Sequence, residues 1–493
     1  MSVIVLCVLA TLASLLLVTG TSGRSGPRRR GRSQRPRHTQ IHRSWRAGDD
    51  DARWARRRDL RSLQVPVPQA GRLTLGVSSR RLVALDAGHS LLVVGPTQSG
   101  KTTGLAVPAL LEWQGPVVAA SVKTDLVRDT VAWRRGQGTV WIYDPTASTD
   151  LETSRWSPLD AVSTWSGARR VAAGLVDAGR TSPGALTDGD FWYATAAKLL
   201  APLLLAAATS GRTMADVVRW IDEQETDEVL DALDTAGQSQ ALQALRATWG
   251  RDERQRSAVY STAETVVEVF ADPDVSASAG PGRGRIDPAA LLDAHHSLYL
   301  CAPAHEQRRL RPLFTGLVSR VIEAAYDRAS RQGRPLDPPL LVVLDEAANV
   351  APLAELDVLA STAAGHGIHL VTVWQDLAQL TARYGPRAGS VVNNHRAKLF
   401  LSGIADPTTL DHASALIGEA PHPVSSTTVD RGRSSSTTTT PTYRRLVPAD
   451  ALRRLAPGTG ILISGHLPPA RLTLRPWYRD RELRRRAGSP GDR

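Results

Sequence analysis

The sequence is poor in cysteine, lysine and aromatic residues. Two cysteines, Cys7 and Cys301, are present among 493 residues, so a disulfide-stapled secreted domain is excluded. Aromatic residues make up 5%, while hydrophobic residues at 42% and charged residues at 22% are typical of a globular protein. At roughly 150 residues per domain, the length predicts about three structural units and excludes a peptide hormone or a single small module.

An excess of basic charge is missing from the body of the chain. The formal net charge is +12, but residues 1–61 carry 14 basic and 4 acidic groups, and residues 470–493 carry 8 and 3. Residues 62–469 are left with 38 basic and 41 acidic groups. The overall basicity is therefore no evidence for a DNA-coating surface. Four of the basic residues are lysines, namely Lys101, Lys123, Lys198 and Lys398.

The first 20 residues predict a membrane anchor. Residues 3–18 contain no charged residue and, with Thr19 and Gly20, are just long enough to cross a bilayer. Arginines follow this run rather than precede it, which indicates that the rest of the chain lies in the cytoplasm. We therefore expect a transmembrane helix over 1–20 and a basic flexible linker over 21–72. A cleaved signal peptide or a buried helix is the alternative.

Apolar runs in the body alternate between strand and helix periodicity. Strands are expected at 82–85, 91–94, 117–120, 140–143, 297–301, 340–344, 368–374 and 397–401. Helices are expected at 101–113, 125–133, 310–328 and 355–364. This alternation is typical of a parallel α/β fold, which we place over residues 73–164 and 286–480.

Residues 165–285 have helical periodicity without a strand-like run, and they predict an all-α domain inserted into the α/β domain. Its closing stretch, 272–285, reads as a loop. We expect a Ser/Thr-rich loop at 424–442 and a basic tail at 481–493.

The clearest motif is GPTQSGKT, which fits the phosphate-binding P-loop pattern between an apolar strand and a helix. Its two glycines allow backbone N–H groups to point at phosphate oxygens. Lys101 would bridge the β- and γ-phosphates, and the Thr102 hydroxyl would bind Mg²⁺. The residues predicted to bind the nucleotide are Gly95, Pro96, Thr97, Gln98, Ser99, Gly100, Lys101, Thr102 and Thr103.

A P-loop hydrolase also needs a carboxylate for the magnesium shell and a group that activates water. The strand at 340–344 ends in Asp345, read as the magnesium carboxylate, and Glu346, read as the catalytic base. Gln375 follows the strand at 368–374 and could sense the γ-phosphate. An amide that caps the helix starting at Asp376 is the alternative for Gln375.

Several segments in this order resemble the type IV secretion coupling proteins of the TraG/TraD kind. They are GPTQSGKTTGLAVPALLEW, VVAASVKTDL, YDPTASTDLETSRWSPLDA, FWYATAAKLLAPLLLAA, LYLCAPAHEQRRLRPLFTGLVSRVI, the segment beginning LLVVLDEAANV, and LVPADALRRLAPGTGILISGHLPPARLTLRPWY. The resemblance covers about residues 73–480. It implies a RecA/FtsK-like motor domain with ATP and Mg²⁺ as cofactors.

The same resemblance implies a membrane-anchored homohexamer at the inner membrane, with its body in the cytoplasm. It also implies recognition of single-stranded, relaxase-bound DNA and its delivery to a type IV secretion channel. Lys123 matches the lysine of the family's second strand motif.

Three features depart from the family pattern. One transmembrane helix is predicted where two are usual, so the anchor is reduced or the start truncated. His366 lies in a segment that often carries an arginine acting in trans, and a neutral imidazole replaces guanidinium poorly. Ser121 stands where an acidic residue is usual. The alternative functions are an FtsK-like chromosomal DNA translocase and a substrate-docking receptor with weak or no ATP turnover.

Overall fold

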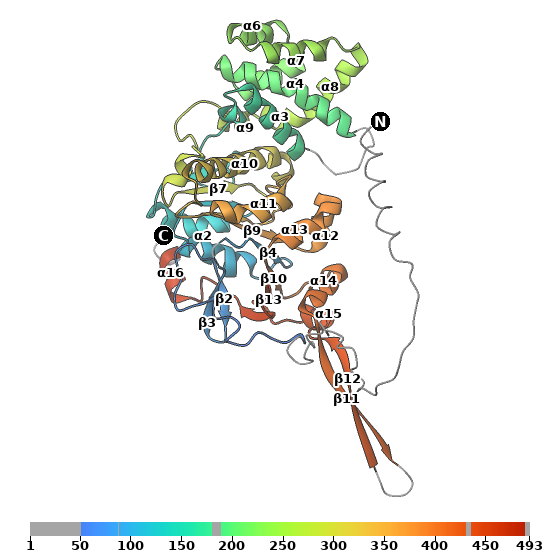
Figure 1. Ribbon diagram of the computed structural model, residues 1–493. Coiled ribbons are helices and arrows are strands. Elements are labelled where there is room, and N and C mark those ends of the chain that lie inside the picture. Colours follow the sequence, from blue (N-terminus) through green and yellow to red (C-terminus); the bar gives the residue numbers. More distant parts are fainter. Residues whose placement is uncertain (1–50, 87, 180–188, 430–434, 489–493) are drawn as a thin grey trace, which may run out of the picture. The chain divides into compact units, whose positions relative to one another are not determined.

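The structure, a computed structural model, describes residues 51–86, 88–179, 189–429 and 435–488. The anchor predicted for residues 1–20 and the first 30 residues of the predicted linker lie outside these ranges. The described chain is built around a sheet of 12 strands (Figure 1). The sheet and the helices on its two faces form the α/β domain that the alternation of strands and helices predicts.

Seven neighbouring strands of this sheet are parallel. In spatial order they are β10 (Ala397–Leu401), β4 (Leu91–Val94), β9 (Ile368–Trp374), β8 (Leu340–Leu344), β5 (Val117–Ser121), β7 (Ser297–Cys301) and β6 (Val140–Tyr143). The predicted strands at 91–94, 140–143, 297–301, 340–344, 368–374 and 397–401 are confirmed with these bounds. They were recognisable because strands buried on both faces are mostly apolar.

An antiparallel extension continues the sheet beyond β10. It consists of β13 (Thr459–Ser464), β14 (Ala470–Thr473), β2 (Thr74–Ser78), β3 (Arg81–Ala84) and β1 (Gln64–Val65). The last of these strands belongs to the predicted flexible linker, and that prediction is wrong for its described part. Leu60 and Leu63 are buried in the core, so apolar contacts hold this segment against the sheet. The sequence did not indicate this, because the two leucines lie among many arginines.

Side chains alternate between two hydrophobic clusters, one on each face of the sheet. Leu91 and Val93 of β4 point into one cluster, and Leu92 and Val94 point into the other. The first cluster is closed by α1 (Val107–Glu112), α2 (Asp125–Arg135) and α16 (Arg481–Ala487). The basic tail expected at 481–493 thus begins with the helix α16. Its Leu483 and Ala487 side chains are buried against the sheet.

The opposite face is covered by a second set of helices, of which α10 is the longest. They are α10 (Gln307–Gln332), α11 (Leu356–Thr362), α12 (Leu377–Tyr384), α13 (Ala388–Asn394), α14 (Pro407–Ile417) and α15 (Ala449–Arg453). The helix predicted at 101–113 forms in two parts, a π-helical segment at Thr102–Ala106 followed by α1. Such π-helical segments are rare and often lie at functional sites.

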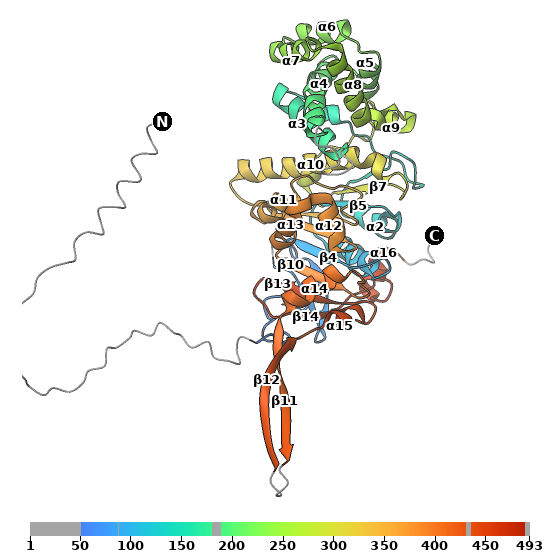
Figure 2. The same ribbon diagram turned by 90° about the vertical axis from the view of Figure 1, so that its right-hand side faces the viewer.

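Residues between β6 and β7 form a bundle of helices. Its members are α3 (Trp165–Gly179), α4 (Gly189–Thr209), α5 (Met214–Asp222), α6 (Asp227–Thr235), α7 (Ser239–Trp249), α8 (Glu253–Val267) and α9 (Pro273–Ser278). In Figure 2, α4 runs among the other helices, and it contacts α3, α5, α6, α7 and α8. The prediction of a loop over 272–285 is wrong in part, because α9 forms there. The Asp272 side chain caps this helix by accepting hydrogen bonds from the backbone N–H groups of Asp274 and Val275.

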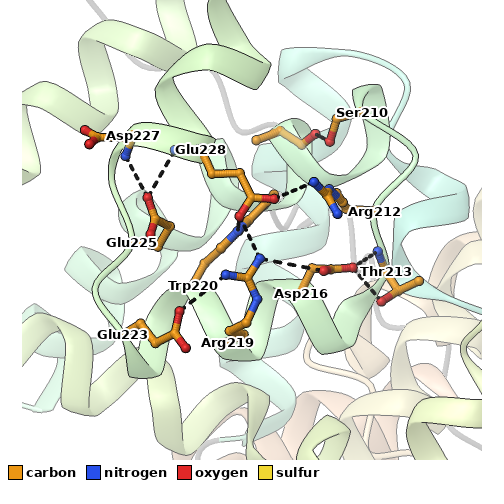
Figure 3. A network of polar contacts seen from close by, with 11 residues as sticks. Ser210, Arg212, Thr213, Asp216, Arg219, Trp220, Glu223, Glu225, Asp227 and Glu228 are labelled. Carbon is orange, nitrogen blue, oxygen red and sulfur yellow. Dashed lines mark hydrogen bonds and ion pairs between the residues drawn. The ribbon is translucent and has the colours of Figure 1, made fainter.

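Among the described residues, α4 is the one helix long and apolar enough to cross a membrane. Its apolar window is 61% buried inside the bundle, so here it is a core helix. A polar network closes the nearby corner between α5 and α6 (Figure 3). The Glu228 carboxylate accepts hydrogen bonds from Arg219 at 2.6 Å and from the Trp220 indole at 2.9 Å, and Arg212 pairs with it at 2.7 Å.

The Ser/Thr-rich loop expected at 424–442 is instead most of a long β-hairpin. Its strands are β11 (Glu419–Val429) and β12 (Ser435–Arg445), paired from Glu419 opposite Arg445 to Val429 opposite Ser435. Figures 1 and 2 both show it extending away from the rest of the described chain. Threonine and valine favour extended backbone, but a hairpin without a buried face lacks the apolar alternation by which strands are recognised.

Candidate functional site

The P-loop follows β4 and leads into the π-helical segment, as the motif predicts. Gly100 has φ +89°, a conformation that residues other than glycine rarely adopt. At Gly95, a Cβ atom would lie 2.8 Å from Ser99 Oγ and 2.9 Å from Leu401 Cβ. Gln98 also has a positive φ, 63°, and such strained backbone is held where a loop must wrap closely around a ligand.

Lys101 is buried beneath this loop. Its ammonium group donates hydrogen bonds to the carbonyl oxygens of Gly95 at 2.6 Å and Pro96 at 2.9 Å. Burial lowers the pKa of Lys101, while the nearby carboxylates of Asp345 and Glu346 raise it. The cation is therefore positioned between the loop and two acidic residues, where it can interact with phosphate oxygens.

Asp345 lies directly after β8, and its side chain contacts the last residue of the P-loop motif and the last residue of the neighbouring strand β5. The Thr102 hydroxyl donates a hydrogen bond of 2.9 Å to Asp345 Oδ2, and the Ser121 hydroxyl lies 3.4 Å from the same oxygen. Burial raises the pKa of Asp345, and the bond from Thr102 lowers it. Ser121 thus contacts the predicted magnesium carboxylate even though it is not acidic.

Glu346 and Gln375 lie together at the ends of β8 and β9. The Gln375 amide nitrogen is 3.4 Å from Glu346 Oε1, and Asn349 is 3.4 Å from the other carboxylate oxygen. The helix that follows is capped by Asp376, whose carboxylate accepts a hydrogen bond from the Gln379 N–H at 2.9 Å. The capping alternative for Gln375 is therefore wrong, and its side chain contacts the predicted base.

A cleft brings most of the predicted residues together. It is lined by Thr97, Gln98, Gly100, Lys101, Thr102, Thr103, Val122, Lys123, Asp125, Asp345 and Glu346. Asp125 also lines the cleft, and the sequence did not predict it as a site residue. One of its carboxylate oxygens is buried without a hydrogen-bond partner among the described residues. An aspartate in the first turn of a helix is common, because its negative charge interacts favourably with the helix dipole. The sequence therefore does not distinguish Asp125 from an ordinary helix-stabilising aspartate.

The oxygen atoms in this cleft fit a magnesium ion. Mg²⁺ prefers hydroxyl and carboxylate oxygens, and it commonly takes one or two protein carboxylates together with phosphate oxygens and water. Thr102 and Asp345 supply one hydroxyl and one carboxylate 2.9 Å apart. In the part of the chain that the structure describes, no group of three or more His, Cys, Asp or Glu side chains could hold a metal.

The family of the chain follows from a comparison with family profiles. The profile described as "Type IV secretory system Conjugative DNA transfer" matches residues 54–491. The chain belongs to this family. The match covers both the sheet with its cleft and the inserted helices, and it confirms the resemblance to coupling proteins drawn from the order of the motifs.

Curated relatives of the conjugative DNA transfer family are similar over most of the chain. The conjugal transfer protein TraG of Escherichia coli is 26% identical over 415 residues, which are 75% of this chain and 64% of that protein. Protein VirD4 of Agrobacterium fabrum is 25% identical over 412 residues, which are 80% of this chain and 60% of that protein. The chain thus spans about three fifths of the length of these relatives.

Solved structures share the fold. The bacterial conjugative coupling protein TrwBdeltaN70 in its unbound form superposes with a TM-score of 0.64, at 19% identity, over 85% of this chain and 91% of that one. The plasmid coupling protein TrwB in complex with ADP and Mg²⁺ has a TM-score of 0.60, at 19% identity, over 84% and 96%. These similarities confirm the predicted RecA-like α/β fold with its helical insertion.

Proposed function

We propose that this chain is the ATPase of a type IV coupling protein, which uses ATP to drive DNA toward a conjugation channel. The observation that carries this proposal is the hydrogen bond of 2.9 Å between Thr102 and Asp345. It brings the hydroxyl of the P-loop to the acidic end of a parallel strand, which is where a nucleotide-bound Mg²⁺ is held in P-loop hydrolases. The TrwB structures with ADP and Mg²⁺ and with a non-hydrolysable ATP analogue support the choice of ligands.

The predicted residues in and beside the cleft then have distinct roles. The backbone of residues 95–100 would hold the phosphates, and Lys101 would neutralise their charge. Thr102 and Asp345 would hold Mg²⁺, which when bound offsets the negative charge on the transferred phosphoryl group. Glu346 would accept a proton from the attacking water, and Gln375, in contact with that carboxylate, would orient it.

The family match extends the proposal to partners. We propose a relaxase-bound DNA substrate, expected in single-stranded form, a type IV secretion channel as the recipient, and assembly as a homohexamer at the inner membrane. Residues 1–20 would form the anchor, and the body would lie in the cytoplasm. Support comes from the family's description as a conjugative DNA transfer family and from the similarity to TraG and VirD4 proteins.

ATP turnover by the purified full chain, with and without single- and double-stranded DNA, tests this function. Lys101→Ala is expected to lower turnover at least about 100-fold, because it removes a charge aimed at the transferred phosphoryl group. Lys198→Ala is the matched control, since Lys198 is an exposed lysine of α4 outside the cleft. DNA is expected to raise the turnover of the unsubstituted chain and of the control.

Two other outcomes would favour the alternatives. Tight ATP binding without turnover, with or without DNA, would contradict a motor and indicate a docking receptor. A gene deletion that leaves plasmid transfer intact but produces unresolved chromosome dimers at septa would indicate an FtsK-like translocase.

A further inference from the structure

A cavity of about 180 Å³ lies between α3 of the inserted helical domain and α10, which covers one face of the sheet. The two helices lie side by side in Figures 1 and 2. The wall of the cavity is mostly apolar, with Trp156, Val171 and Leu175 among its members. The cavity shares no lining residue with the nucleotide cleft. Since an apolar cavity of about 150 Å³ can bind benzene, this one has room for a small ring-shaped molecule.

Two residues of the wall carry a polar group without a hydrogen-bond partner among the described residues. They are Trp156, whose indole N–H is unpaired, and Thr315, whose hydroxyl is unpaired. Both residues are buried, with exposed fractions of 2% and 6%. A threonine hydroxyl inside a helix often donates to a carbonyl one turn earlier, as Thr209 does to Leu205 at 2.8 Å. Because an unpaired buried donor is unfavourable, both groups indicate a hydrogen-bond acceptor in the cavity.

One wall residue, Gly174 of α3, keeps the cavity open. A Cβ atom at this position would meet no other atom within 4 Å, so packing does not require glycine there. Glycine inside a helix is less favourable than alanine, and folding alone therefore does not explain it. Gly316 on the facing helix is different, because a Cβ atom there would lie 3.1 Å from Cη2 of Trp156. Space for a bound molecule accounts for Gly174.

The charges around the cavity favour an anion. Arg320 and Glu323 both line it and pair with each other at 3.0 Å, so their charges cancel. Arg170 also lines it, at an exposed position of α3, and forms no ion pair with the described residues. A guanidinium group binds a carboxylate strongly, through charge-assisted hydrogen bonds. The unpaired cation thus indicates that the acceptor in the cavity is a carboxylate.

We propose that the cavity binds a small organic carboxylate whose other end is an aromatic ring or an apolar group of similar size. The apolar end would lie against Trp156, Val171 and Leu175, where burial removes it from water. The carboxylate would accept hydrogen bonds from Thr315 and Arg170. Small-molecule sites commonly have such an apolar wall with a few polar groups, and they often lie between domains. The bound molecule would contact both α3 and α10 and so stabilise the contact between the inserted domain and the α/β domain.

Fluorine NMR of para-fluorobenzoate mixed with the purified full chain tests this proposal. For a probe of about ten non-hydrogen atoms we expect a Kd of about 1 mM or lower. Thr315→Val keeps the shape of the side chain and removes the hydroxyl, so it is expected to raise this Kd roughly threefold to tenfold. In the absence of the probe it should not lower the Tm, since the hydroxyl has no partner to lose. Thr265→Val, at an exposed position of α8, is the matched control.

A second variant fills the cavity instead. Gly174→Leu places a side chain in the open space and is expected to raise the Kd at least about tenfold by excluding the ring. Ala173→Leu is its control, because Ala173 is the neighbouring exposed residue of α3 and does not line the cavity. Thermal unfolding of both variants verifies that they are folded.

Three results would overturn the proposal. Equal Kd values for Gly174→Leu and Ala173→Leu would show that the probe binds outside the cavity. Fluorobenzene that binds as tightly as para-fluorobenzoate would show that the site does not recognise a carboxylate. No detectable binding by the full chain would leave water as the partner of the Trp156 and Thr315 groups. None of these results would bear on the proposed function, because the cavity is separate from the nucleotide cleft.

Discussion

The amide of Gln375 lies 3.4 Å from the carboxylate of Glu346, although the two residues end different strands of the sheet. Glu346 has a positive φ of 68°, a conformation that costs energy in a residue other than glycine. The structure thus maintains a strained backbone at the residue read as the catalytic base, and it places an amide against it.

Removal of the base should separate ATP turnover from ATP binding. We expect Glu346→Gln to lower turnover by about 100-fold or more, because general-base catalysis contributes on that scale, while the affinity for a fluorescent ATP analogue changes little. Glu355→Gln, at an exposed position, serves as the control. Turnover close to that of the control would show that Glu346 is not the base.

Loss of the magnesium carboxylate should act through the metal. Asp345→Asn is expected to raise the Mg²⁺ concentration needed for half-maximal turnover by at least about tenfold, because it removes a charged oxygen ligand. Ser121→Ala removes the contact of 3.4 Å to the same carboxylate and the hydrogen bond that the hydroxyl accepts from the Lys123 N–H at 3.2 Å, and it should change this concentration far less. A Mg²⁺ titration of both variants measures this. Equal effects of the two variants would contradict Asp345 as the carboxylate that holds the metal.

Two buried histidines should make the protein sensitive to acid. Burial lowers the pKa of His369 and of His395 to about 4. In the unfolded chain the two imidazoles bind protons near pH 6.5, whereas in the folded chain they stay neutral down to about pH 4. The free energy of unfolding therefore falls as the pH drops from 6.5 toward 4. The expected loss is about 1.4 kcal/mol per pH unit for each histidine.

Urea unfolding at pH 7 and pH 5 measures this loss. Replacement of His395 by Gln should reduce the difference between the two pH values, and His305→Gln, at a side chain 79% exposed, should not. A midpoint that does not move between the two pH values would contradict burial of neutral imidazoles.

Gly104 should not tolerate a methyl group. A Cβ atom there would lie 2.9 Å from Leu474 Cβ, so Gly104→Ala is expected to destabilise the fold by about 1–3 kcal/mol through overpacking. Combination with Leu474→Ala should cost less than the sum of the two changes. In thermal unfolding, Gly174→Ala is the control, because open space surrounds that position in α3 and alanine favours helix.

The β-hairpin should be dispensable for folding. Its described side chains at residues 421–426 and 437–445 are exposed. Replacement of residues 423–441 by Asn-Gly would keep the pair His422 and Thr442 next to a two-residue turn. We expect a Tm within about 2 °C of the unsubstituted chain. A larger drop in Tm would show that the hairpin stabilises the body.

Much of the fold was predictable because its signals are local. Strands β4 and β8 are continuous apolar runs, and the P-loop is a short motif whose glycines are required by the backbone itself. Asp345 and Glu346 were recognisable because they follow such a run directly. Local order without a strong apolar pattern was missed, as at Leu60 and Leu63, in α9 and in the hairpin.

The sequence by itself determined the parallel α/β fold, the inserted helices, the P-loop and the acidic strand end, since each depends on neighbouring residues and their periodicity. Tertiary structure alone decided which side chains meet: Thr102 and Ser121 at Asp345, and Gln375 at Glu346. These contacts join residues far apart in the chain. The order in which parallel strands lie side by side sets them, and no pattern within one segment encodes that order.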